Sequence, residues 1–266
     1  MPKGFGIGFG ISGGGGAGYD SDAATYFATV TTSFSAARKT IINTLVTTLK
    51  ADGNWTKLDR LWLFANEASD QGLVSVVNPA ATACTLVNSP TFTADQGFAG
   101  DGATSFIDSN FSLASHGANY LRDDALACCY VRTNTQENGT EIGVLEPSKQ
   151  LYLRTRSTGD TLAYSTNSAT DDSVANTDSR GLSSLYRTGA NATSVYRNTT
   201  QLETGADAST ALTTVDTFIG ACNNNGSTLF YSSKQISIVG FGSSGISNSS
   251  FYTALQNYMT SLSTQV

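Results

Sequence analysis

The spacing of apolar residues changes twice along the chain, and the changes divide it into three kinds of segment. Before residue 64 and after residue 247 apolar residues recur at intervals of three and four, which is typical of a helix with one buried face. Between about residues 72 and 242 they form short alternating or β-branched runs, separated by clusters of Gly, Asn, Asp and Ser. Such runs predict strands joined by turns. We therefore expect helices at both ends and a β-rich middle.

Residues 19–64 are predicted to be helical. Ser35 is suited to cap a helix whose apolar positions are Ile41, Ile42, Leu45, Val46 and Leu49, and Lys50 and Gly53 mark its end. An apolar patch follows, formed by Trp55, Leu58, Leu61, Trp62, Leu63 and Phe64. We interpret this patch as the surface that packs on the next domain, and a tryptophan-rich binding site is the alternative.

Residues 65–246 are predicted to form a β-sandwich, because many short strands with frequent turns and few helical patterns indicate that fold. The run Leu151-Tyr152-Leu153-Arg154-Thr155-Arg156 alternates apolar with polar residues, as a sheet with one wetted face requires. Residues 247–266 are predicted to form a final helix, capped by Ser247 or Asn248. Its apolar face needs a partner, and the N-terminal helices supply one in a small layer beside the sandwich.

Residues 1–18 are rich in glycine and carry large apolar residues at every second position: Phe5, Ile7, Phe9 and Ile11. Glycine raises the entropy lost on ordering, so the segment does not fold alone. Its alternation suits an extended arm that docks in a groove of a partner or packs against copies of itself. A disordered tail is the alternative.

Composition and charge exclude several classes of function. Charged residues make up 14% of the chain and the net charge is −6, with no basic run, so nucleic acid is not an expected partner. No apolar stretch is long enough for a membrane helix, and the glycine-rich start does not resemble a signal peptide. The four cysteines, Cys84, Cys128, Cys129 and Cys222, show no metal or disulfide spacing. We therefore expect reduced thiols and folding in a reducing cytoplasm.

No pattern of catalytic residues is evident, and we predict that the protein is not an enzyme. A glycosidase needs two carboxylates that face each other across the cleaved bond. The glutamates in this region are Glu137, Glu141 and Glu146, but residues 138–140 interrupt any strand that would carry the first two. Solvated turns explain the acidic pairs 123–124 and 171–172 better. The run Gly240–Gly245 lacks the context of a serine nucleophile, since His116 is the chain's one histidine.

Metal and cofactor sites are equally weakly indicated, and we predict none. Asp20 with Asp22, or the run Asn223-Asn224-Asn225, offers oxygen ligands for Ca²⁺, but neither has the ligand number of a defined loop. A turn explains the asparagine run better. The N-terminal glycines lack the Gly-Lys-Ser/Thr sequence of a phosphate-binding loop.

Several short segments resemble those of tailed-phage structural proteins that contain a concanavalin A-like (laminin G-like) jelly-roll sandwich. They are Leu45-Val46 to Leu49-Lys50, Trp55-Thr56-Lys57-Leu58-Asp59, the run from Gly97 to Phe111, Ser194-Val195-Tyr196-Arg197-Asn198, Phe218–Ala221, Ile238–Gly242, and the helix with Phe251-Tyr252 and Tyr258-Met259. The resemblance extends over roughly residues 20–262. The resemblance implies a jelly-roll sandwich with a flanking helical layer and no catalytic residues.

The resemblance also implies a non-enzymatic virion component, such as a tail fibre, tail-tip or capsid-decoration protein, made in the host cytoplasm. Phe5, Ile7, Phe9 and Ile11 would then anchor the chain to other virion proteins. The sandwich would face outward for host attachment. A homo-oligomer is expected, with a trimer by analogy, and host-surface glycans are a further partner class. The alternatives are a carbohydrate-binding lectin module outside a virion, with no glycan-binding residue singled out, and a glucanase-like hydrolase.

Overall fold

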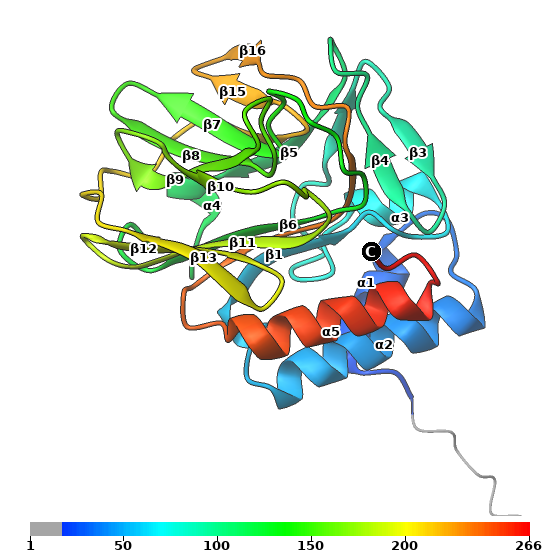
Figure 1. The fold of residues 1–266 in the computed structure, drawn as a ribbon. Helices are drawn as coiled ribbons and strands as arrows, with labels where there is room; N and C mark the ends of the chain where they lie inside the picture. The colour runs from blue at the N-terminus through cyan, green and yellow to red at the C-terminus, as the bar shows by residue number, and fades with distance from the viewer. Residues whose placement is uncertain (1–17) are drawn as a thin grey trace, which may run out of the picture.

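The computed structural model describes residues 18–266, which form two β-sheets packed face to face, with helices on one outer side (Figure 1). The first sheet has eight strands. Along its main path these are β13 (Thr200–Gly205), β12 (Ala192–Arg197), β11 (Gly181–Gly189), β6 (Ala125–Val131), β17 (Gln235–Gly242), β4 (Gly97–Ala99) and β3 (Thr91–Thr93). The eighth strand, β1 (Leu58–Leu63), shares the free edge of β17 with β4: β4 pairs with residues 235–236 and β1 with residues 238–242.

The second sheet has nine strands. Its path is β10 (Asp172–Ala175), β9 (Thr161–Ser168), β8 (Lys149–Arg154), β7 (Ile142–Glu146), β14 (Asp216–Ile219), β5 (Phe106–Ser112) and β2 (Thr85–Val87). The short hairpin of β15 (Cys222–Asn224) and β16 (Ser227–Leu229) joins this sheet through a parallel pairing of β15 with β7. All other pairings in both sheets are antiparallel, so the predicted mainly-β jelly-roll sandwich is confirmed.

The apolar core between the sheets comes from every second residue of the central strands. Trp62, Phe111, Val144, Leu151 and Phe241 are among its members, and all are fully buried. Trp62 makes edge-to-face contacts with Phe111 and Phe241, at ring-centroid distances of 6.3 Å and 6.0 Å. The sandwich is thus closed by aromatic and aliphatic side chains, and it leaves no room for a ligand between the sheets at this point.

The helices lie against the outer face of the eight-stranded sheet (Figure 1). The covering layer consists of α1 (Ser21–Thr29), α2 (Ala36–Ala51) and α5 (Asn248–Ser261). The 3₁₀ turn η1 (Trp55–Lys57) precedes β1, α3 (Ser69–Leu73) lies beside β1, and α4 (Leu113–His116) follows β5 of the nine-stranded sheet. The predicted cap of α2 is confirmed, because the Ser35 side chain accepts a hydrogen bond from the Arg38 backbone N–H. Helix α5 begins after Ser247, as predicted, but the Ser247 side chain makes no capping hydrogen bond. The predicted helical layer is confirmed too.

The structure differs from the sequence prediction at residues 58–63, where a strand replaces the expected helix. All six residues of β1 are buried: Leu61 and Leu63 face the helices, and Trp62 faces the sandwich core. A strand buried on both faces has a continuous apolar run, and periodicity does not distinguish such a run from a helix. The alternative of a tryptophan-rich binding site is wrong, because Trp62 is fully buried and Trp55 nearly so.

The four cysteines are free and buried. Within residues 18–266 no helix has the length and apolar character needed to cross a membrane. The arm residues Phe5, Ile7, Phe9 and Ile11 lie outside the described residues.

Candidate functional site

The outer faces of the two sheets differ in what covers them. Helices α1, α2 and α5 bury the outer face of the eight-stranded sheet, whereas Figure 1 shows β7, β8 and β9 on the side of the molecule away from this layer. A hollow of about 250 Å³ lies on the outer face of the nine-stranded sheet, lined by Asn138, Leu145, Gln150, Tyr152, Arg154, Asp171 and Phe230. This hollow, called the β8 pocket below, is the candidate functional site.

Strand β8 supplies three of the lining residues through its alternation. Leu151 and Leu153 are fully buried in the core of the sandwich. Successive side chains of a strand point to opposite faces. Gln150, Tyr152 and Arg154 therefore share the outer face, and all three line the β8 pocket.

Phe230 brings a second aromatic ring to the pocket from the segment that follows β16. Its ring centroid lies 6.2 Å from that of Tyr152, with the two planes 81° apart. The Phe230 side chain is 43% exposed, and its backbone has φ of 54°. A bulky residue in the left-handed region is an outlier that commonly marks a functional position. The fold thus keeps the Phe230 backbone in an unfavourable conformation, and this conformation places an exposed aromatic ring at the pocket.

The segment that carries Phe230 is fixed by close contact with the turn at Gly139. The Thr140 backbone N–H donates to the Phe230 carbonyl at 2.9 Å. A Cβ atom on Gly139 would lie 2.5 Å from the Ser232 Cα atom. Only glycine therefore allows the two backbones to approach this closely.

The guanidinium of Arg154 lies beside both aromatic rings. Its central carbon is 5.1 Å from the ring centroid of Tyr152 and 5.2 Å from that of Phe230. Both distances are typical of cation–π contacts. Its Nε–H donates to the Gly139 carbonyl at 3.3 Å. Two rings and one backbone carbonyl therefore position this side chain.

Amide and carboxylate groups form the rest of the pocket wall. Asn138 is oriented by Thr158, whose backbone N–H and hydroxyl donate to the Asn138 Oδ1 atom at 3.2 Å and 3.1 Å. This leaves the Asn138 amide nitrogen as a donor. Gln150 and Asp171 add further polar groups at the same hollow. Aromatic rings surrounded by a few hydrogen-bonding groups are typical of a small-molecule site.

Burial raises the pKa of Tyr152 to about 12. The phenol therefore stays protonated at neutral pH and acts as a hydrogen-bond donor. Sialidases use a tyrosine as the nucleophile, and a nucleophile is activated when its pKa is lowered. The shift of Tyr152 has the opposite direction, so this side chain is poorly suited to nucleophilic catalysis.

Two of the glutamates considered in the sequence meet at a buried lysine. Lys234 Nζ lies 3.0 Å from the Glu141 carboxylate and 3.6 Å from that of Glu137. Ser232 Oγ donates to the same two carboxylates, at 3.0 Å and 2.7 Å. Lys234 and Glu141 are fully buried, so this cluster is an internal ion pair. Because Glu141 and Lys234 have no exposed surface, the cluster is closed to a substrate.

The aspartate and asparagine residues considered as Ca²⁺ ligands have other roles in the structure. Lys50 Nζ forms ion pairs with Asp20 and Asp22 at 2.6 Å and 2.7 Å. The Asn223 side chain donates to the Asp216 carbonyl, and Asn225 has φ of 48°, as a turn requires. Across the part of the chain that the structure describes, no group of three or more His, Cys, Asp and Glu residues is arranged to hold a metal ion.

The serine run at 240–245 is also part of the framework. Ser243 and Ser244 both donate hydrogen bonds to Asp124, at 2.8 Å and 2.7 Å. His116 lies elsewhere, where its Nδ1 atom accepts from the Ser112 backbone N–H and its ring stacks on Phe111. These residues are therefore not arranged as a catalytic triad.

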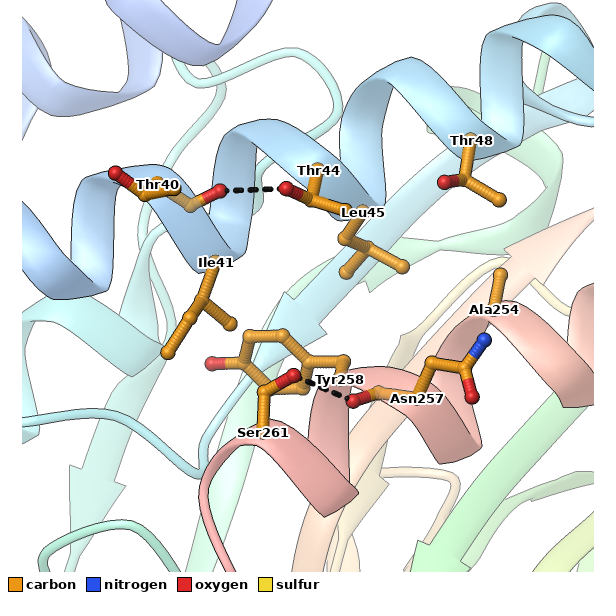
Figure 2. A pocket seen from close by; sticks show the side chains of 9 residues that line it. All are labelled: Thr40, Ile41, Thr44, Leu45, Thr48, Ala254, Asn257, Tyr258 and Ser261. Carbon is orange, nitrogen blue, oxygen red and sulfur yellow. Dashed lines mark hydrogen bonds between the residues drawn. The ribbon is translucent and has the colours of Figure 1, made fainter.

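A second hollow, of about 130 Å³, lies between α2 and α5 and is shown in Figure 2. Threonines line its α2 side, and the Thr44 hydroxyl donates to the Thr40 carbonyl at 2.9 Å. On the α5 side the Ser261 hydroxyl donates to the Asn257 carbonyl. Because these hydroxyls are bonded within their own helices, the hollow offers few groups for a polar ligand.

Comparisons with known proteins identify the fold but no family. No family model and no curated protein matches the chain. Among solved structures, a mutant of Trypanosoma rangeli sialidase with trans-sialidase activity is similar, with 14% identity and a TM-score of 0.51. The sialidase of the same organism in complex with 2,3-difluorosialic acid gives the same identity and TM-score. The matches cover 83% and 84% of this chain but 39% of each sialidase chain.

These similarities correct the function predicted from the sequence. The two solved structures named above are sialidases rather than virion components, so the prediction of a non-enzymatic phage virion protein is wrong. One sandwich fold serves many functions, so short motifs that follow its strands and turns do not identify a role. At 14% identity the similarity establishes the fold alone. The chain is similar in fold to part of these sialidases.

Proposed function

We propose that this protein binds carbohydrate in the β8 pocket. The observation that carries the proposal is the pairing of Tyr152 with the exposed Phe230 beside Arg154, on the outer face of the sheet that lies away from the layer of α1, α2 and α5. Sugar rings have apolar C–H faces and hydroxyl edges. Aromatic rings complement the faces, while amide, guanidinium and carboxylate groups complement the edges.

The proposed role is binding without hydrolysis. Hydrolysis by paired carboxylates needs two of them about 5–10 Å apart across the bond that is cleaved. Asp171 is the one carboxylate among the residues that line the β8 pocket. Glu141 is fully buried and paired with Lys234, and the raised pKa of Tyr152 disfavours a tyrosine nucleophile. The pocket therefore has groups that recognise a sugar and lacks a pair that would cleave it.

The proposal is tested by glycan-array binding of the whole chain, followed by titration of the strongest glycan into wild type and Phe230→Ala. We expect Phe230→Ala to weaken binding at least tenfold, or about 1.4 kcal/mol, because a central aromatic contact is lost. Leu229→Ala is the matched control, since Leu229 is the exposed neighbour at 39% and does not line the pocket. Absence of binding to every glycan class, or equal losses in both variants, would overturn the proposal.

A further inference from the structure

The charge of Arg154 is a feature of the β8 pocket that a neutral sugar leaves unmatched. Among residues 18–266 no carboxylate lies within ion-pair distance of Arg154, and its single hydrogen bond there uses Nε. The two terminal nitrogens, with four N–H groups, are therefore left for a ligand. We propose that the sugar bound in this pocket carries a carboxylate, which Arg154 binds through both terminal nitrogens. This inference rests on the proposed function.

The geometry of Arg154 favours a planar anion over a hydroxyl group. A guanidinium presents its donors as a rigid fork that matches the two oxygens of a carboxylate. The rings of Tyr152 and Phe230 lie about the guanidinium at 5.1 Å and 5.2 Å, so the fork is already oriented before the ligand arrives. An oriented donor loses less side-chain entropy on binding.

The negative charges of the protein do not cancel this preference. Asp171 lines the same pocket but is exposed to solvent and forms no ion pair with Arg154, which is itself partly buried. Exposed charges are screened by water and salt much more than partly buried ones. The net charge of −6 acts over distances that physiological salt largely screens. The local field at the fork is therefore set by Arg154.

The experiment is an array that carries neutral, uronic-acid and sulfated oligosaccharides, probed with wild type, Arg154→Gln and Arg154→Lys. The best uronic-acid oligosaccharide is then compared with its carboxyl-reduced form, which has the same backbone and no charge. We expect preferential binding of the uronic-acid oligosaccharides and at least a tenfold loss on carboxyl reduction. Arg154→Gln should give a similar loss, and Arg154→Lys a smaller one, because lysine keeps the charge without the fork.

The control variant is Arg122→Gln, which removes an exposed arginine that pairs with Asp123 and does not line the pocket. It should leave every affinity unchanged. Binding of neutral sugars alone, a preference for sulfated glycans, or an Arg154→Gln variant with wild-type selectivity would overturn this inference while leaving the proposed function intact. Absence of binding to all three classes would overturn the proposed function itself.

Discussion

On both sheets every second side chain of a strand points outward, but one outer face is buried under helices and the other lines a hollow. On β6 the outward residues Leu126, Cys128 and Tyr130 are apolar or aromatic and are buried under the helices. On β8 the outward residues are Gln150, Tyr152 and Arg154, and they line a hollow. The contrast shows that the outward-facing residues of a sheet indicate whether another layer packs on it. A fully apolar outward row indicates a covering layer, whereas a row that mixes aromatic, amide and guanidinium groups indicates a binding surface.

The largest effect that should separate the two faces is on stability. Phe251 is a fully buried residue of α5 in the cluster that joins the helices to the eight-stranded sheet. Phe251→Ala should lower the free energy of unfolding by about 3–5 kcal/mol, because it removes a large core side chain and leaves a cavity. Phe230→Ala on the other face should lower it by less than about 1 kcal/mol, because Phe230 is partly exposed. Chemical denaturation measures both values, and equal losses would contradict the contrast between the faces.

A smaller effect concerns charge at the edge where the two sheets meet. Burial, together with the carboxylates of Asp207 and Glu203, raises the pKa of Asp172 on β10. A raised pKa in the folded state means that the group favours folding while it is protonated. That contribution is lost as the pH rises through the folded pKa. At neutral pH the ionised Asp172 therefore lowers stability.

Asp172→Asn should consequently raise the unfolding free energy by up to about 1 kcal/mol at pH 7. The gain should shrink as the pH falls into the acid range, where the wild-type carboxyl takes up its proton. Asp178→Asn is the opposite control. Arg180 and Arg197 lower the pKa of Asp178, so its contribution is present above the unfolded pKa and is lost in acid. Thermal melts across this range measure both, and parallel pH profiles would refute the assignment.

The sequence predicted one half of the candidate site and missed the other. The alternation in residues 151–156 already places Tyr152 and Arg154 on the wetted face of a sheet, although it does not single them out for binding. Phe230 is missed because its ring reaches Tyr152 only after the sandwich has formed, across nearly eighty residues of sequence. The positive φ of Phe230 has no sequence signal, since bulky residues rarely adopt it.

The dependence on contacts distant in sequence also explains the error at residues 58–63 and the buried ion pair that the sequence did not indicate. Strand β1 is buried on both faces, which removes the alternation that identifies a strand. The pairing of Glu141 with Lys234 joins residues far apart in sequence, so neither residue alone indicates a buried ion pair. The starting residues of α2 and α5, in contrast, are predicted correctly, because a helix face and its first residues are local in sequence.

The central claim is that the uncovered sheet face binds the sugar, and nuclear magnetic resonance of the isotope-labelled chain tests it most directly. The strongest oligosaccharide from the array is titrated into the protein, and backbone and side-chain shifts are followed. The claim predicts that the largest changes fall on Gln150, Tyr152, Arg154 and Phe230. Changes confined to the hollow between α2 and α5, with the β8 pocket unperturbed, would contradict it.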